Sequence, residues 1–121
     1  MDLAEGDAVA VAPIETCGSC RSCRGGHRNT CRRVAIYGGY REPLDGGLAR
    51  YVVVSRGAAH RVPEGLAVEE AALAEPVAVA VHAVRRAPFL LGRSVLVLGG
   101  GPIGLAIVQV ARAAGAEPIL V

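Results

Sequence analysis

The sequence predicts a mixed β and α/β chain, in which a β-rich N-terminal part is followed by the first βαβ part of a parallel sheet. Three observations carry this prediction: a β-branched strand near the N-terminus, a polar loop that holds all four cysteines, and a glycine-rich turn between a short apolar strand and a helix. With 52% hydrophobic residues in 121, the chain can bury one core or parts of two.

The N-terminal part reads as strands joined by turns. Residues 8–14 alternate small and β-branched side chains, and Pro13 suits the end or edge of a strand. The Asp-Gly-Gly turn at 45–47 precedes a second predicted strand at 48–55, which contains three consecutive valines. The Pro-Glu-Gly sequence at 63–65 is expected to end this β-rich part.

The C-terminal part changes to helices and short apolar strands. Residues 68–74 predict a helix, and Pro76 is expected to push Glu75 out of the helical region and to open a second helix at 77–86. A strand at 94–98, a helix at 102–114 capped by Gly115 and a strand at 119–121 then predict the opening of a parallel βαβ unit. We therefore predict two domains, at 1–75 and 76–121.

Composition excludes several classes of function. A net charge of +2 and the lack of tryptophan argue against a nucleic-acid partner, and no apolar run reaches the ~20 residues of a membrane helix. The acidic residues near the N-terminus do not fit a signal peptide. Four clustered cysteines favour a metal in a reducing compartment over a disulfide framework, so a cytoplasmic location is expected.

The cysteines have the spacing of a single metal site. Cys17, Cys20, Cys23 and Cys31 form C-x2-C-x2-C-x7-C, which lets one loop surround a zinc ion with four thiolates. Such a closed site is structural, because catalytic zinc needs an open position. Five arginines in and beside the loop either offset the negative charge of this site or are simply solvated: Arg21, Arg24, Arg28, Arg32 and Arg33.

Other readings of the cysteines stay open, and one of them is that they are structural cysteines without a ligand. The cysteine run of an iron–sulfur electron-transfer protein also opens with C-x2-C-x2-C, but its fourth cysteine typically follows after three residues and precedes proline. Here Cys31 follows after seven residues and precedes Arg32. A zinc-stabilised interaction module would have no need of the glycine turn described next. His27 lies inside the loop and is expected to face solvent, because four cysteines already complete the ligand set.

The glycine turn has the pattern of a dinucleotide-binding site. Gly99, Gly101 and Gly104 form G-x-G-x-x-G after a predicted strand and before a helix, so we assign cofactor binding to the whole turn: Gly99, Gly100, Gly101, Pro102, Ile103 and Gly104. Free N–H groups at the helix start would face a pyrophosphate. Glu117 precedes the second strand and is not assigned to ribose binding, so the choice between NAD and NADP stays open.

Together these motifs resemble the zinc-dependent medium-chain dehydrogenases. The resemblance rests on four segments in family order: GDAVAVAP at 6–13, CGSCRSCRGGHRNTC at 17–31, DGGLARY at 45–51 and GGGPIG at 99–104. It implies a partial GroES-like catalytic domain, with a structural-zinc lobe at 15–33, followed by the start of a Rossmann domain. AEPVAVAVHAV at 74–84 is closest in pattern to the sorbitol, polyol and threonine dehydrogenases.

The resemblance also implies a function. In that group the glutamate at Glu75 is a ligand of a catalytic zinc or a partner of its bound water, whereas His82 is expected to be a packed helix residue. The implied reaction moves hydride between a small alcohol or polyol and NAD or NADP, in a parent protein that forms a homo-oligomer. The other catalytic-zinc ligands of the family have no counterpart in this sequence, so the chain by itself is expected to be inactive.

Overall fold

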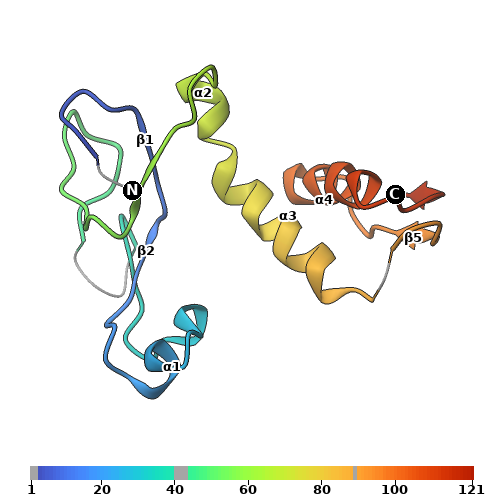
Figure 1. Ribbon diagram of the computed structural model, residues 1–121, viewed down its shortest axis with the longest axis horizontal. Helices are drawn as coiled ribbons and strands as arrows, with labels where there is room; N and C mark the ends of the chain where they lie inside the picture. The colour runs from blue at the N-terminus through green and yellow to red at the C-terminus, as the bar shows by residue number, and fades with distance from the viewer. Residues whose placement is uncertain (1–2, 40–43, 89) are drawn as a thin grey trace. The chain divides into compact units, whose positions relative to one another are not determined.

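The computed structural model describes residues 3–39, 44–88 and 90–121 (Figure 1). The chain divides into two compact units, Met1–Glu64 and Gly65–Val121. The first unit carries short antiparallel strands and the cysteine loop, and the second carries helices and a parallel strand pair. The division predicted after residue 75 assigns the segment 65–75 to the first domain and remains a prediction.

Two antiparallel strand pairs build the first unit. β1 (Val9–Val11) pairs with β4 (Ala59–Arg61), and β2 (Ile14–Glu15) pairs with β3 (Ala35–Ile36). The strand predicted at 8–14 is therefore present but divided, because Pro13 has no N–H to donate to a ladder. β4 was not predicted from the sequence.

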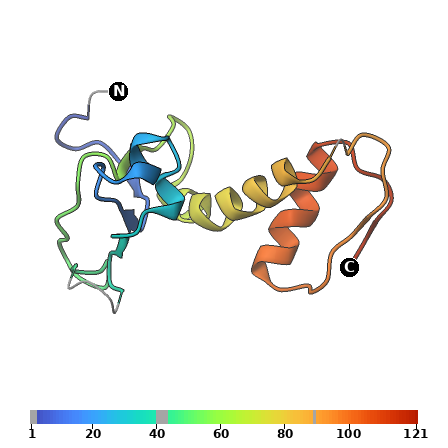
Figure 2. The ribbon, with the colours of Figure 1, turned by 90° about the horizontal axis from the view of Figure 1, so that it is seen from below.

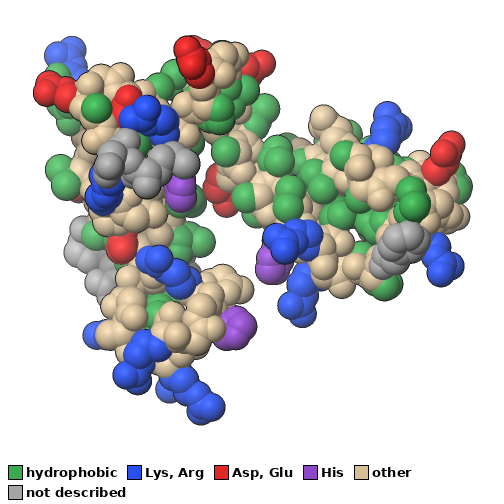
Figure 3. Space-filling view, in the orientation of Figure 1, with side chains coloured by type: hydrophobic (Ala, Val, Ile, Leu, Met, Phe, Trp, Pro, Cys, Tyr) green, Lys and Arg blue, Asp and Glu red, His purple; other side chains and the backbone are tan. Residues whose placement is uncertain are grey.

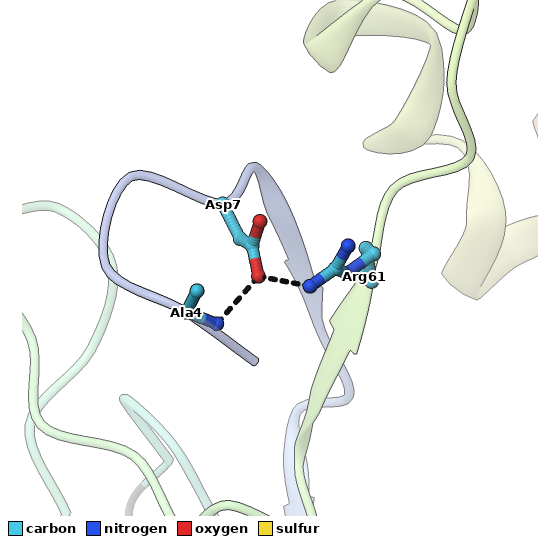
Figure 4. Close-up of polar contacts among 3 residues, drawn as sticks. All are labelled: Ala4, Asp7 and Arg61. Atoms are coloured by element: carbon cyan, nitrogen blue, oxygen red, sulfur yellow. Dashed lines mark hydrogen bonds and ion pairs between the residues drawn. The ribbon is translucent and has the colours of Figure 1, made fainter. Parts of the chain in front are cut away.

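The outer end of the β1–β4 pair is fixed by one carboxylate (Figure 4). Asp7 Oδ2 accepts hydrogen bonds from the backbone N–H of Ala4, at 2.6 Å, and from Arg61 Nη2, at 2.5 Å. Arg61 lies opposite Val9 in the ladder. Asp7 thus joins the turn before β1 to the strand that pairs with it.

The second predicted strand, at 48–55, is wrong: this segment contains bends at its start and joins no strand ladder among the described residues. The exposure of its side chains does alternate, since Val53 is 91% exposed while Val52 and Val54 are half-buried. The β-branched pattern predicted a strand, but a strand also requires a hydrogen-bonding partner.

The second unit begins with helices α2 (Val68–Ala71) and α3 (Ala74–Arg86). The expectation that Pro76 excludes Glu75 from the helix is wrong, because α3 begins at Ala74 and Pro76 is its third residue. Proline is tolerated there, since the first N–H groups of a helix have no intrahelical acceptor. The helix predicted at 68–74 is present as α2 but ends at Ala71, and the predicted end of the second helix at Arg86 is confirmed.

The predicted strand–helix–strand order is confirmed at the C-terminal end. β5 (Val95–Leu96) and β6 (Ile119–Leu120) are parallel, and α4 (Pro102–Ala113) connects them. Gly115 follows α4 with φ of +84°, a conformation that glycine adopts at no steric cost. This unit therefore contains one βαβ connection, which places the glycine turn directly after β5 (Figure 2).

Helices α3 and α4 pack against each other in the second unit. Ala80 of α3 and Ala111 of α4 are fully buried, and such small side chains allow two helices to approach closely. The expectation of a packed His82 is wrong, because this side chain is exposed on α3. Within the described residues, no helix combines the length and the apolar character needed to cross a bilayer.

Candidate functional site

The cysteine loop lies between two paired strands. β2 ends at Glu15 and β3 begins at Ala35, and these two residues are partners in the ladder. The backbone N–H of Tyr37 extends the pairing by donating to the carbonyl of Pro13 at 3.0 Å. Both ends of the loop are therefore fixed close together by backbone hydrogen bonds, which reduces the entropy that metal binding must overcome.

Inside the loop, two short helical turns aim the cysteines inward. α1 (Arg21–Arg24) carries Cys23, and the 3-10 turn η1 (Arg28–Thr30) ends at Cys31. The chain reverses at Gly18 and Gly26, whose φ values of +67° and +81° favour glycine. The loop thus surrounds one point from both sides.

The four cysteine sulfurs gather at that point. The Sγ atoms of Cys17, Cys20, Cys23 and Cys31 all lie within 4.8 Å of one another, and those of Cys17 and Cys31 are 3.5 Å apart. A tetrahedral site with zinc–sulfur bonds of about 2.3 Å has sulfur–sulfur edges of about 3.8 Å. The four thiols therefore fit one tetrahedral soft-metal ion, with no position left for a substrate.

The surroundings of the sulfurs control their protonation. Backbone N–H groups of Cys20 and Ser19 donate to the sulfur of Cys17 and lower the pKa of that thiol to about 5. Burial and the neighbouring sulfur of Cys20 raise the pKa of Cys23 to about 11. A metal that binds all four sulfurs as thiolates must displace the protons that they still carry.

Two of the five loop arginines form hydrogen bonds across the loop. Arg28 Nε donates to Thr16 Oγ1 at 3.0 Å, and Arg33 Nη2 donates to Ser19 Oγ at 2.8 Å. Thr16 and Ser19 were not predicted from the sequence as partners of these arginines. Several arginine side chains gather over the part of the first unit that carries α1 (Figure 3).

The glycine turn connects β5 to α4, as predicted. Gly99 has φ of +113°, and a Cβ atom at Gly104 would lie 1.9 Å from the carbonyl oxygen of Gly99. A Cβ atom at Gly101 would meet no atom within 4 Å. Gly104 is therefore required by the packing of helix against turn, whereas the space beside Gly101 is open to a ligand.

That open space is a hollow of about 550 Å³ at the start of α4. It is lined by β5 and the turn, including Gly99, Gly101, Pro102, Ile103 and Gly104. Gly100 is not in this lining. A Cβ atom at Gly100 would instead lie 3.7 Å from Cγ1 of Val121. The backbone N–H groups of the first turn of a helix attract anions, so the hollow suits a phosphate group.

The remaining candidates lie outside the cysteine cluster. Glu75 is exposed in the first turn of α3, and nothing in the structure tests its assignment to a catalytic zinc. His27 is exposed and precedes η1, as expected, and it does not belong to the cluster of possible metal ligands.

Comparison with known proteins places these features in a family. The model of the alcohol dehydrogenase GroES-like domain matches residues 1–64. D-xylulose reductase A of Aspergillus oryzae is 40% identical over 118 residues, which cover 98% of this chain and 32% of the reductase. The chain thus spans about a third of the length of the curated relatives it matches.

Solved structures give the same family. L-idonate 5-dehydrogenase from Escherichia coli has a TM-score of 0.89 at 36% identity, covering 97% of this chain and 34% of that one. Galactitol-1-phosphate dehydrogenase from Escherichia coli has a TM-score of 0.87 at 36% identity, with coverages of 98% and 34%. The chain belongs to the zinc-containing medium-chain dehydrogenases, and its first unit is their alcohol dehydrogenase GroES-like domain.

Proposed function

We propose that this chain supplies the structural-zinc lobe and the pyrophosphate-binding turn of a zinc-containing polyol or secondary-alcohol dehydrogenase that uses NAD or NADP. The observation that carries the proposal is the gathering of four cysteine sulfurs within 4.8 Å in one loop. Four thiolates at tetrahedral spacing, with no open position, suit an ion that stabilises the fold rather than one that binds substrate.

In this proposal Cys17, Cys20, Cys23 and Cys31 hold the ion and thereby keep the loop folded. Their free thiol state suits a reducing compartment, so a cytoplasmic location is part of the proposal. The β2–β3 pair fixes the base of the loop, and the backbone N–H groups that point at Cys17 stabilise its thiolate. The metal would therefore join two arms of one loop.

The glycine turn binds the cofactor pyrophosphate in this proposal. Gly101 leaves room for a phosphate oxygen beside the backbone, and the first turn of α4 provides N–H donors and the positive end of the helix dipole. Gly104 keeps α4 close to the turn. A cofactor held there by its pyrophosphate would supply the nicotinamide that exchanges hydride with the substrate.

The substrate class follows from the relatives. Those cited above are named for the reduction of a ketose sugar and for the dehydrogenation of a sugar acid and of a polyol phosphate. We assign Glu75 to a catalytic zinc, where a carboxylate in the first turn of a helix has its charge stabilised by the helix dipole. Such a zinc, when bound, polarises the substrate oxygen. Assembly into a homo-oligomer belongs to the same proposal.

Metal analysis of the purified chain tests the central part of this proposal. The expected result is one zinc per chain, bound through four sulfurs. Iron with inorganic sulfide would contradict it and favour an iron–sulfur electron carrier.

The role of Glu75 is tested in an active dehydrogenase that contains this sequence. Glu75→Gln should lower activity or catalytic-zinc occupancy by more than about tenfold. The matched control is Glu69→Gln, because Glu69 is an exposed carboxylate in the first turn of the neighbouring helix α2. Equal kinetics in the two variants would refute the assignment.

A further inference from the structure

The cysteine loop is closed by side chains other than its cysteines. Its entry arm, residues 16–20, and its exit arm, residues 28–33, are joined by the hydrogen bonds from Arg28 to Thr16 and from Arg33 to Ser19. Each bond spans 12 or 14 residues of sequence, so neither belongs to a local turn. Both donors are on the exit arm, and both acceptors are hydroxyl groups on the entry arm.

These bonds lie immediately beside the metal ligands. Thr16 precedes Cys17, Ser19 precedes Cys20, and Arg33 is two residues after Cys31. The backbone N–H of Arg33 also donates to the Cys31 sulfur at 3.4 Å. The same pair of arms brings the sulfurs of Cys17 and Cys31 to 3.5 Å. These contacts hold the two arms in the geometry that places the sulfurs of Cys17 and Cys31 side by side.

We propose that Arg28 and Arg33 are positioning residues, which hold the two arms of the cysteine loop together and so preorganise Cys17 and Cys31 for metal binding. The inference rests on the proposed zinc site. The role is limited to these two arginines and does not extend to Arg21 and Arg24. The side chains of Arg21 and Arg24 make no hydrogen bond or ion pair among the described residues.

Charge gives Arg33 the larger share of this role. Four thiolates around a zinc ion carry a formal surplus of two negative charges, and a guanidinium that is fixed beside them offsets part of it. Arg33 is fixed twice, by its side chain on Ser19 and by its backbone N–H on Cys31. An unattached arginine in the same loop contributes only diffuse charge, which salt screens.

Zinc release to a strong chelator, measured on the full chain, tests the proposal. Arg33→Gln should release zinc about tenfold faster than the unaltered chain, in line with the loss of a neighbouring ligand-orienting contact. Arg24→Gln is the matched control, because it removes the same charge from the same loop but breaks no recorded contact, and its release rate should stay within about twofold. Arg28→Gln should fall between the two.

Ser19→Ala separates hydrogen bonding from charge and serves if Arg33→Gln does not fold. It keeps every arginine, so faster zinc release in Ser19→Ala shows that the cross-loop bond matters. Hydrogen exchange in the metal-free chain adds a readout without zinc. The backbone N–H of residue 33 should exchange faster in Ser19→Ala and in Arg33→Gln than in the unaltered chain.

Each outcome separates this inference from the proposed function. If the unaltered chain binds no zinc, the proposed function fails first. If it binds zinc and Arg33→Gln and Arg24→Gln release it equally fast, net charge alone accounts for the effect and the positioning role is refuted. Unchanged exchange at Arg33 in the metal-free Ser19→Ala chain would refute it independently.

Discussion

The cysteine loop and the glycine turn are both candidate binding sites, but they are built in opposite ways. The loop carries its whole ligand set within residues 17–31, on side chains that converge on one point. The turn offers backbone N–H groups beside an open hollow, and its glycines act by the absence of a side chain. A side-chain site is lost by removing a ligand, whereas a backbone site is lost by adding an atom.

The largest expected effect comes from breaking the loop. Cys23→Ser replaces a soft thiolate with a hydroxyl, so zinc retention on dialysis against a chelator should fall by more than about a hundredfold. His27→Ala is the control in the same loop, because His27 is exposed and outside the cluster, and it should retain zinc. Loss of zinc in both variants would mean that the ligands are assigned wrongly.

The next effect comes from adding an atom to the turn. Gly104→Ala places a Cβ atom 1.9 Å from the carbonyl oxygen of Gly99, so the second unit should lose at least about 2 kcal/mol of unfolding free energy. Gly101→Ala should cost about 1 kcal/mol or less, because its added methyl group meets open space and only the preference for glycine over alanine at the N-cap of α4 is lost. Urea unfolding followed by NMR signals of α4 measures both.

A larger side chain at Gly101 tests the turn at the level of binding. Gly101→Val should leave zinc content unchanged and should abolish nicotinamide cofactor binding in a dehydrogenase that contains this sequence, since its side chain fills the phosphate position. Unaltered cofactor affinity would reduce the turn to a structural connection between β5 and α4.

A smaller effect is expected at the base of the loop. Tyr37 Oη donates to Glu15 Oε2 and accepts from the Ser55 N–H, each at 2.9 Å, so Tyr37→Phe should cost the first unit about 1 kcal/mol of unfolding free energy. Hydrogen bonds from Ser55 and Tyr37 lower the pKa of the Glu15 carboxyl below 4.5. Their contribution is complete above pH 4.5 and is lost as pH falls through the lowered pKa. Urea unfolding at pH 7 and pH 3 should therefore differ less for Tyr37→Phe than for the unaltered chain, and an equal difference would contradict the contact.

The smallest effect is expected at the β1–β4 pair. Asp7→Asn removes the ion pair with Arg61, whose side chain is 43% exposed, so the loss should be about 0.5 kcal/mol or less. High salt should reduce the difference between Asp7→Asn and the unaltered chain, as measured by thermal unfolding. A difference that persists in 1 M salt would mean that the hydrogen bonds of Asp7, rather than its charge, hold the pair.

Both sites could be predicted from the sequence because their signals are local. The ligand spacing of the cysteines predicted the cluster, because four residues within one loop cannot lie far apart. The glycine pattern predicted the order β5, turn and α4 for a similar reason: the signal is local. The strand at 48–55 failed because a ladder depends on a partner elsewhere in the chain, which β-branched residues do not specify.

The helix errors have equally physical causes. Pro76 was expected to come at the start of its helix, but a helix tolerates proline throughout its first turn, and α3 therefore begins two residues earlier. His82 was expected to pack, yet the face of α3 that carries it is exposed. The cross-loop partners Thr16 and Ser19 were missed because single hydroxyl residues carry no pattern in sequence.

The central claim is tested most directly by X-ray absorption at the zinc edge, combined with elemental analysis of the purified 121-residue chain. One zinc per chain is expected, with four sulfur neighbours at about 2.3 Å and no oxygen or nitrogen in the coordination shell. A zinc with a nitrogen or oxygen ligand, or a chain that carries iron and sulfide in its place, would contradict it.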